Sequence, residues 1–121
     1  MVRRVAIIGT GMVRSGTSDG PSWELFARAA LEAIREAGIE LSQIEALHLG
    51  NVYSAFTENQ TNMSPKVLSA IGIENPIPCI RYETACASSS VAFRQGYLNI
   101  LSGGYNLLLV GGTERLRAVP G

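Results

Sequence analysis

The feature that most constrains the fold of this chain is a regular alternation of apolar runs with segments of helical periodicity. The runs are rich in Val, Ile and Leu and lie at Val2–Ile8, within Ile44–Tyr53, at Ile77–Tyr82 and at Asn106–Val110. Near-continuous apolar runs of this length are typical of strands that are buried on both faces. The alternation predicts an α/β fold of the order βαβαβαβ, with a mostly parallel sheet and helices on both faces.

Three segments between these runs have the spacing and the end signals of helices. The predicted helices run from Ser22 as N-cap to Ala37 before a stop at Gly38, from about Ser64-Pro65 to Gly72, and from Ser88 to Leu101. The segment from Tyr53 to Asn62 is polar and predicts a loop. The chain contains no internal repeat or linker, so we expect one domain at most.

Composition excludes several classes of protein. Ten basic and ten acidic residues give a net charge of zero and lie scattered singly, which argues against binding to nucleic acid or to an anionic membrane. Charged residues make up 17% and hydrophobic residues 46% of the chain, a balance that suggests apolar surface for an interface. Two cysteines give no disulfide framework. Without a signal peptide or a membrane-spanning run, the chain is expected to be cytoplasmic.

A candidate nucleophile, Cys86, lies in the turn between the third apolar run and the third predicted helix. Unpaired N–H groups and the positive end of the helix dipole gather at such a position, which favours a thiolate and a developing oxyanion. Ala85, Ala87 and Ser88 are small and leave room for a substrate to approach the sulfur. The alternative is that Cys86 is an inert buried thiol.

Other motifs favour structural interpretations. Gly9-Thr10-Gly11 follows the first run but has Arg14 where a dinucleotide fingerprint needs a third glycine, so we expect a tight turn there. Gly111-Gly112 likewise predicts a backbone turn with no room for a side chain. A carboxylate such as Glu114 just beyond is more often structural or solvated, and the alternative is that it orients a catalytic loop by hydrogen bonding. Glu83 is interpreted as a turn or interface residue.

The only histidine and the second cysteine are poorly placed to supply the base that a nucleophilic cysteine needs. His48 falls within the second predicted strand, where a histidine is more often structural than catalytic. Cys79 falls within the third predicted strand, beside Pro78 and Ile80, and is interpreted as part of the core.

Four segments of the sequence together resemble the thiolase superfamily. The nucleophile segment E-T-A-C-A-S-S-S-V-A-F-R-Q-G-Y begins at Glu83, and the other three are V-A-I-I-G-T-G-M from Val5, G-N-V-Y-S from Gly50 and L-L-L-V-G-G-T-E-R-L from Leu107. They occur in the family's order and span nearly the whole chain. With T-N-M-S-P from Thr61, the chain is most similar to sterol-carrier-protein-type and archaeal-type thiolases. Many relatives have glycine at or next to Ser89, where a serine is expected to alter the turn slightly.

The resemblance implies that residues 1–121 are part of the N-terminal domain of a two-half fold. The remaining strand of that half, the loop region that binds much of coenzyme A and the whole C-terminal half are then absent. In the family, the catalytic histidines and a second catalytic cysteine come from the later part. Only Cys86 is therefore carried over, as the acyl acceptor, with its own N–H as an oxyanion donor, and the residues that bind coenzyme A stay unassigned.

The implied activity is that of an acetyl-CoA C-acyltransferase in lipid metabolism. Cys86 would accept an acyl group from acyl-CoA for Claisen condensation, or for thiolysis of 3-oxoacyl-CoA in the reverse direction. Coenzyme A thioesters are the substrates, and neither a metal nor a bound cofactor is expected. Family members dimerise through the strand that corresponds to Ile77–Tyr82, so we expect a homo-oligomer, and a partner chain is a further way to supply the C-terminal half. The alternatives are a condensing enzyme of the ketoacyl synthase kind and a non-catalytic assembly module.

Overall fold

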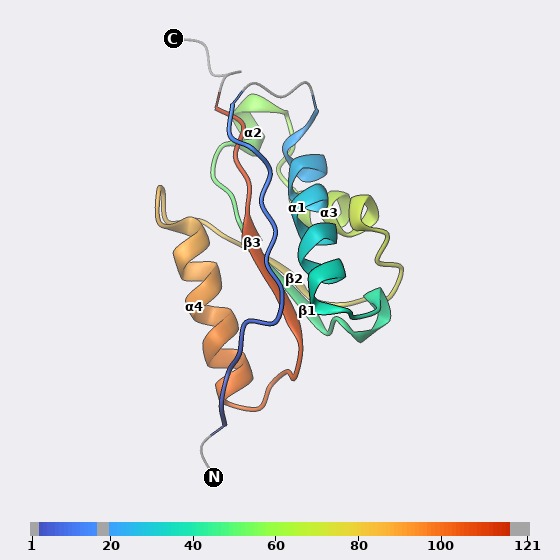
Figure 1. Ribbon diagram of the computed structural model, residues 1–121. Coiled ribbons are helices and arrows are strands. Elements are labelled where there is room, and N and C mark those ends of the chain that lie inside the picture. Colours follow the sequence, from blue (N-terminus) through green and yellow to red (C-terminus); the bar gives the residue numbers. More distant parts are fainter. Residues whose placement is uncertain (1–2, 17–19, 117–121) are drawn as a thin grey trace.

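The protein forms a three-stranded parallel sheet that is covered by helices. The computed structural model describes residues 3–16 and 20–116. Strands β1 (Ala46–Gly50), β2 (Cys79–Tyr82) and β3 (Leu108–Gly112) are arranged in the order β2-β1-β3, and both pairs are parallel (Figure 1). The predicted α/β class and parallel sheet are confirmed.

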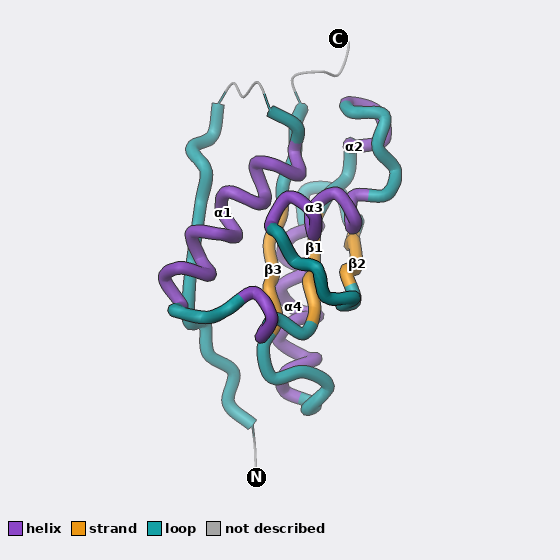
Figure 2. The backbone as a smooth tube through the Cα atoms, turned by 90° about the vertical axis from the view of Figure 1, so that its right-hand side faces the viewer, coloured by secondary structure: helices purple, strands orange, loops and turns teal. Residues whose placement is uncertain are grey.

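Helices lie on both faces of this sheet, as the alternation predicts. Helices α1 (Ser22–Ala37) and α3 (Met63–Ile71) cover one face, and α4 (Ser88–Leu101) covers the other (Figures 1 and 2). A short 3-10 helix at Leu41–Gln43 and a single turn, α2 (Ser54–Thr57), complete the helical elements of the described residues. The segment that contains α2 was predicted to be a loop, and its single turn is closed by hydrogen bonds to the carbonyl of Tyr53.

The ends of the two helices on the first face follow the predicted signals closely. Gly38 ends α1 with φ 66° and Gly72 ends α3 with φ 91°, a left-handed conformation that costs glycine little. The N-cap prediction is wrong by one residue, because Pro21 is the N-cap of α1 and Ser22 is already helical. The hydroxyl of Ser22 instead donates to Glu58, so a residue far along the chain caps this helix end.

The core is centred on β1, whose five residues are all buried because the strand is central. Successive side chains of a strand point to opposite faces. Leu47 and Leu49 pack with apolar residues of α1 and α3, while His48 on the opposite face contacts α4. Because β2 and β3 both pair in parallel with this buried strand, the carboxyl ends of all three strands lie at the same end of the sheet.

The prediction of a first strand at Val2–Ile8 is wrong for the part that the structure describes. Val2 lies outside the described residues, and residues 3–8 are extended but make no ladder with any described strand (Figure 2). The segment is attached to helices instead, because Arg3 donates to the Ile100 carbonyl at 3.1 Å and the Thr10 N–H donates to Glu36 at 2.5 Å. The sheet of the described residues therefore has three strands rather than four.

The expected turn at Gly9-Thr10-Gly11 is also absent. These residues continue the extended segment along α1, where a side chain on Gly9 would clash with the Ala33 carbonyl and one on Gly11 with the Ala29 carbonyl. The two glycines allow the backbone to approach the helix closely, which is a packing role that the lone motif could not indicate.

Candidate active site

Cys86 lies at the carboxyl end of the sheet, in the turn that joins β2 to α4. Its side chain is exposed, and it immediately precedes Ala87, the N-cap residue of the fourteen-residue helix. The predicted position at a helix N-terminus is therefore confirmed in geometry, and the alternative of a buried thiol is wrong. In open parallel sheets, ligands bind beyond the carboxyl ends of the strands.

The turn around Cys86 is held by hydrogen bonds from both sides. The Ser88 hydroxyl accepts the Thr84 N–H at 2.9 Å and donates to the Ala85 carbonyl at 2.7 Å. Glu83 accepts the Ala85 N–H at 2.7 Å, which agrees with its interpretation as a turn residue. Ala85 itself has φ 51°, an uncommon conformation for a residue with a side chain. These contacts fix the backbone that presents the thiol.

Two glycines let the N-terminus of α4 approach the strand ends. Gly50 ends β1 and Gly112 ends β3, and the two are partners in the ladder. A Cβ on Gly50 would lie 2.5 Å from the Ser89 backbone nitrogen, and one on Gly112 would clash with the Ser89 hydroxyl. Gly111-Gly112 belongs to the end of a strand and is not the predicted turn, although the prediction that no side chain fits is confirmed.

Glu114 organises the loop that follows β1. Its carboxylate accepts the N–H of Val52 at 2.7 Å, the N–H of Tyr53 at 2.9 Å and the side-chain amide of Asn51 at 3.2 Å. The Asn51 amide also donates to the Thr113 carbonyl at 3.0 Å. These contacts argue against a solvated carboxylate and give Glu114 a structural role, as the acceptor that holds the loop after β1.

A second carboxylate, that of Glu58, joins the loop after β1 to the start of α1. It accepts the Ser22 N–H at 2.7 Å and lies 4.0 Å from Arg115, and its side chain is only 3% exposed. Thr113 donates to the Ser22 carbonyl at 2.9 Å. Sequence reasoning missed Glu58 and Asn51, because their partners lie tens of residues away along the chain.

His48 is fully buried between β1 and α4. Its Nδ1 lies 3.4 Å from the Ala92 carbonyl and its Nε2 lies 3.4 Å from the Asn99 side-chain nitrogen. Burial lowers the pKa of His48, and the Ala92 carbonyl offsets part of that effect. The ring has no exposed surface from which to reach Cys86 or a substrate, which agrees with a structural interpretation.

Cys79 is half-buried at the start of β2 and packs against the core. Burial raises the pKa of this thiol, and a hydrogen bond with Ser64 opposes the shift. Elsewhere in the described residues, no cluster of three or more His, Cys, Asp or Glu side chains has the arrangement of a metal site. No helix in residues 3–16 and 20–116 has the length and apolar character to cross a membrane.

Comparison with known proteins agrees with this geometry and identifies the family. The model of the thiolase N-terminal domain matches residues 5–121. The chain belongs to the thiolase family. This thiolase domain is 37% identical to an acetyl-CoA acetyltransferase of Methanocaldococcus jannaschii and 31% identical to one of Methanothermobacter thermautotrophicus.

Both alignments include 98% of this chain but only 30% and 31% of the relatives, so the chain spans about a third of their length. Among solved structures, the domain superposes on 3-oxoacyl-(acyl-carrier-protein) synthase III of Aquifex aeolicus with a TM-score of 0.72 and 20% identity, over 88% of this chain and 34% of that one. It superposes on acetyl-CoA acetyltransferase of Syntrophomonas wolfei with a TM-score of 0.68 and 19% identity, over 87% and 27%. These likenesses show a shared fold.

Proposed function

We propose that this domain supplies the acyl-accepting cysteine of an acetyl-CoA C-acyltransferase. The observation that carries the proposal is the position of Cys86, exposed on a hydrogen-bonded turn one residue before the N-cap of α4. The Cys86 thiolate attacks the thioester carbonyl of acyl-CoA, the bond from that carbon to the coenzyme A sulfur breaks, and coenzyme A leaves as a thiolate that takes up a proton. An acyl-cysteine thioester remains.

The following step requires residues beyond these 121. In the condensation direction, a second acyl-CoA loses an α-proton and its carbanion attacks the acyl-cysteine; thiolysis of 3-oxoacyl-CoA is the reverse. Removal of a weakly acidic proton needs a base within hydrogen-bond reach. His48 is buried against α4, so in this proposal the base, like most of the coenzyme A site, comes from outside these 121 residues, either from the same polypeptide or from a partner chain. The complete enzyme follows ping-pong kinetics.

The thiolase proposal is preferred over a ketoacyl synthase because the relatives that are more than 30% identical are named acetyl-CoA acetyltransferases. The synthase in the structural comparison shares the fold at 20% identity. A non-catalytic assembly module is the remaining alternative. An exposed thiol on a turn fixed by three hydrogen bonds is more than such a module needs.

The proposed assembly is a homodimer in which β2 pairs with its copy, in a cytoplasmic enzyme of lipid metabolism. Strand β2 lies at an edge of the sheet, and Ile80 on it is 42% exposed. An unprotected strand edge with apolar side chains favours pairing with another chain. Sedimentation of the wild-type chain should reveal a dimer that Ile80→Lys weakens, and a monomer at high concentration would contradict the proposal.

The test of the acyl-acceptor role is acylation by acetyl-CoA, followed by intact mass and peptide mapping. We expect a single acetyl group on Cys86, which persists in Cys79→Ser and is lost in Cys86→Ala. Cleavage of acetoacetyl-CoA with free coenzyme A should not turn over, since the base is absent. Acetyl transfer to Cys79 would contradict the role of Cys86, and absence of any adduct would favour the assembly module. In the complete enzyme, attack on the acyl-cysteine by a malonyl thioester that loses CO2, instead of by a second acetyl-CoA, would favour the synthase.

A further inference from the structure

The carboxyl ends of the three strands are joined by one buried residue, Asn51. It directly follows β1 and is only 1% exposed. Its side-chain Nδ2 donates to the Thr113 carbonyl at 3.0 Å and to the Glu114 carboxylate at 3.2 Å, both just beyond β3. Its backbone N–H donates to the carbonyl of Tyr82, the last residue of β2, at 3.3 Å. Asn51 therefore contacts the ends of both neighbouring strands.

The side-chain oxygen of Asn51 faces a cation, the guanidinium of Arg81 on β2. Arg81 donates from Nη1 to Asn51 Oδ1 at 3.5 Å and to the hydroxyl of Ser54 at 3.2 Å. Within residues 3–16 and 20–116, no carboxylate lies within 4.0 Å of this half-buried guanidinium. A partly buried cation needs polar partners that replace the water it has lost. The loop after β1 supplies these partners.

The orientation of the Asn51 amide suits both of the charges beside it. Its Nδ2 carries the positive end of the amide dipole and faces Glu114, whereas its Oδ1 carries the negative end and faces Arg81. A flipped amide would place Oδ1 against two acceptors, the Thr113 carbonyl and the Glu114 carboxylate. We call Arg81, Asn51 and Glu114 together the Asn51 clamp. It connects β2 to the segment after β3 across the end of β1.

The Asn51 clamp fixes one end of the turn that holds Cys86. Arg81 is the penultimate residue of β2, and residues 83–87 lie between β2 and α4. The other end of the turn is fixed separately, because a Cβ on Gly50 would lie 2.5 Å from the Ser89 nitrogen of α4. The turn is a short connection between two fixed points. A shift at the end of β2 therefore has to be absorbed within the turn.

We propose that Arg81 is a positioning residue for Cys86 and acts through the Asn51 clamp. This role rests on the proposed function of Cys86 as the acyl acceptor. Loss of either charged member of the clamp frees the end of β2 from the segment after β3, and the turn then shifts relative to the N-terminus of α4. The thiolate of Cys86 loses part of the stabilisation that a helix N-terminus gives.

The sign of the effects separates positioning from direct electrostatics. If the two charges acted on the thiolate separately, removal of the Arg81 cation would make the thiolate less favourable and removal of the Glu114 carboxylate would make it more favourable. A shared positioning role gives the same sign for both. It is also not additive, because either loss opens the same hydrogen-bond network.

The experiment measures alkylation of Cys86 by iodoacetamide at about pH 8, with peptide mapping and half-buried Cys79 as the reference for global opening. Arg81→Gln and Glu114→Ala should each slow the alkylation of Cys86 by about fivefold. The double variant should be no slower than the slower single variant. Circular dichroism checks that each variant is folded, and Glu114→Gln takes the place of Glu114→Ala if that variant is not.

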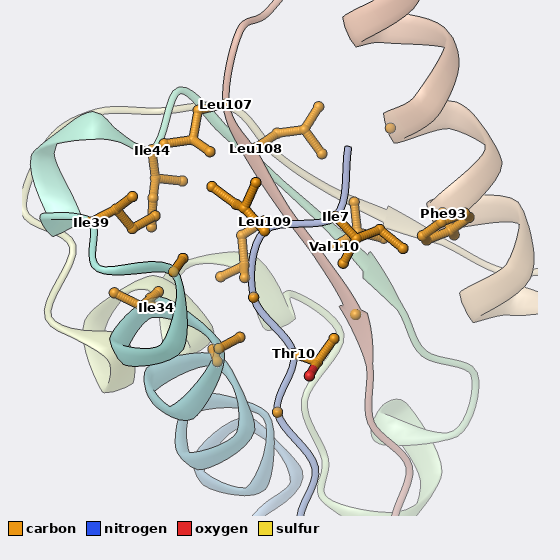
Figure 3. A pocket seen from close by; sticks show the side chains of 18 of the residues that line it. Ile7, Thr10, Ile34, Ile39, Ile44, Phe93, Leu107, Leu108, Leu109 and Val110 are labelled. Carbon is orange, nitrogen blue, oxygen red and sulfur yellow. The ribbon is translucent and has the colours of Figure 1, made fainter. Parts of the chain in front are cut away.

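Two control variants lie away from the Asn51 clamp. Arg28→Gln removes the charge of an exposed arginine on α1. Ile7→Ser changes the apolar groove of about 540 Å³ beside β3, which residues 4–11 and 106–112 help to line and to which no residue of the clamp contributes (Figure 3). Both controls should leave alkylation of Cys86 within about twofold of the wild-type rate.

Three results would overturn the proposal. Slower alkylation in Arg81→Gln with faster alkylation in Glu114→Ala would mean that the two charges act on the thiolate separately. Additive slowing in the double variant would mean that they support the turn independently. Wild-type rates in both single variants would mean that the Asn51 clamp does not position Cys86. Iodoacetamide needs no coenzyme A, so a Cys86 that is alkylated normally but not acetylated by acetyl-CoA would overturn the proposed function and not the clamp.

Discussion

The surroundings of β3 differ between its carboxyl end and its outer edge, which is the edge that faces away from β1. Beyond the carboxyl end, Glu114 accepts hydrogen bonds from the N–H groups of Val52 and Tyr53 in the loop after β1, and Glu58 accepts one from the N–H group of Ser22 at the start of α1. Along the outer edge, the backbone borders an apolar groove where Ile7 is largely exposed. The first region pairs these backbone N–H groups with side chains of the same chain, whereas the outer edge of β3 makes no ladder with any described strand. The turn that holds Cys86 lies at the carboxyl end of the sheet, with the first region.

The largest effect is expected from Gly50→Ala at the carboxyl end. The new Cβ would lie 2.5 Å from the Ser89 backbone nitrogen and 2.6 Å from its Cα, so the start of α4 has to move. Overpacking of this kind destabilises by roughly 3 kcal/mol. Urea denaturation measures the loss, and acylation of Cys86 should slow at the same time because the turn moves with the helix.

The matched control is Gly104→Ala. This glycine is exposed, and its Cβ would lie 3.3 Å from the nearest atom, the Asn99 carbonyl oxygen. We expect a change in stability below about 1 kcal/mol and no change in acylation. Equal losses in the two variants would mean that the close approach of α4 to β1 is not what stabilises this end of the sheet.

The next largest effect is expected from Glu114→Ala, which removes the acceptor for three donors from residues 51–53. Partly buried N–H groups left without partners cost about 2 kcal/mol in total. Glu114→Gln retains one side-chain oxygen and should lose less. Thermal unfolding measures both changes, with exposed Glu74→Ala as the control. If Glu114→Ala lost no more stability than Glu74→Ala, the hydrogen bonds to Glu114 would not stabilise the loop after β1.

The sequence predicted the carboxyl end better than the outer edge, and the reason is physical. The strand–turn–helix pattern around Cys86 depends on local signals, and α4 has the predicted bounds Ser88–Leu101. The predicted strand Val2–Ile8 has an equally clear apolar pattern, yet residues 3–8 pair with no described strand. A pattern reports which surface a strand could bury, whereas pairing depends on which neighbour is present.

The hydrogen bonds that hold the loops around the candidate site could not be predicted from the sequence, because most of them join residues far apart along the chain. Glu58 and Ser22 are separated by 36 residues, and Glu114 and Val52 by 62. Nothing in the local sequence around a carboxylate indicates a backbone N–H so far along the chain. Ser88 is different, since a small hydroxyl residue at the start of a helix commonly bonds to nearby backbone, and that signal was available.

A smaller effect is expected from pH, through His48 beneath α4. Burial lowers the pKa of His48 in the folded protein below its usual value of 6.5, so the unfolded chain binds a proton more readily. Stability should therefore decrease as the pH falls below about 6.5 and stop decreasing below the folded-state pKa.

Denaturant titrations from about pH 7 to pH 5 measure this slope. His48 is the only histidine in the chain, so His48→Asn should be less stable overall but nearly independent of pH across the same range. If the free energy of unfolding of His48→Asn still decreased with falling pH, another group would be responsible for the pH dependence, and burial of His48 would not lower its pKa.

The smallest effect is expected from Glu36→Gln on α1, where the carboxylate holds Thr10 of the N-terminal extended segment. Hydrogen bonds from the Thr10 N–H and then from its hydroxyl lower the pKa of Glu36, so this contribution is present above about pH 4.5 and is lost as the pH falls through the folded-state pKa. The carboxylate is fully exposed, and the segment that it holds makes no ladder, so the unfolding midpoint should not change. Exchange of the Thr10 amide should nevertheless become faster, since its partner is replaced by a neutral amide.

Glu32→Gln is the matched control, because Glu32 accepts the Met12 N–H at the longer distance of 3.3 Å and its loss should change amide exchange less. If Glu36→Gln instead lowered the midpoint as much as Glu114→Ala, the N-terminal segment would belong to the cooperative core, and the contrast between the two sides of β3 would be wrong.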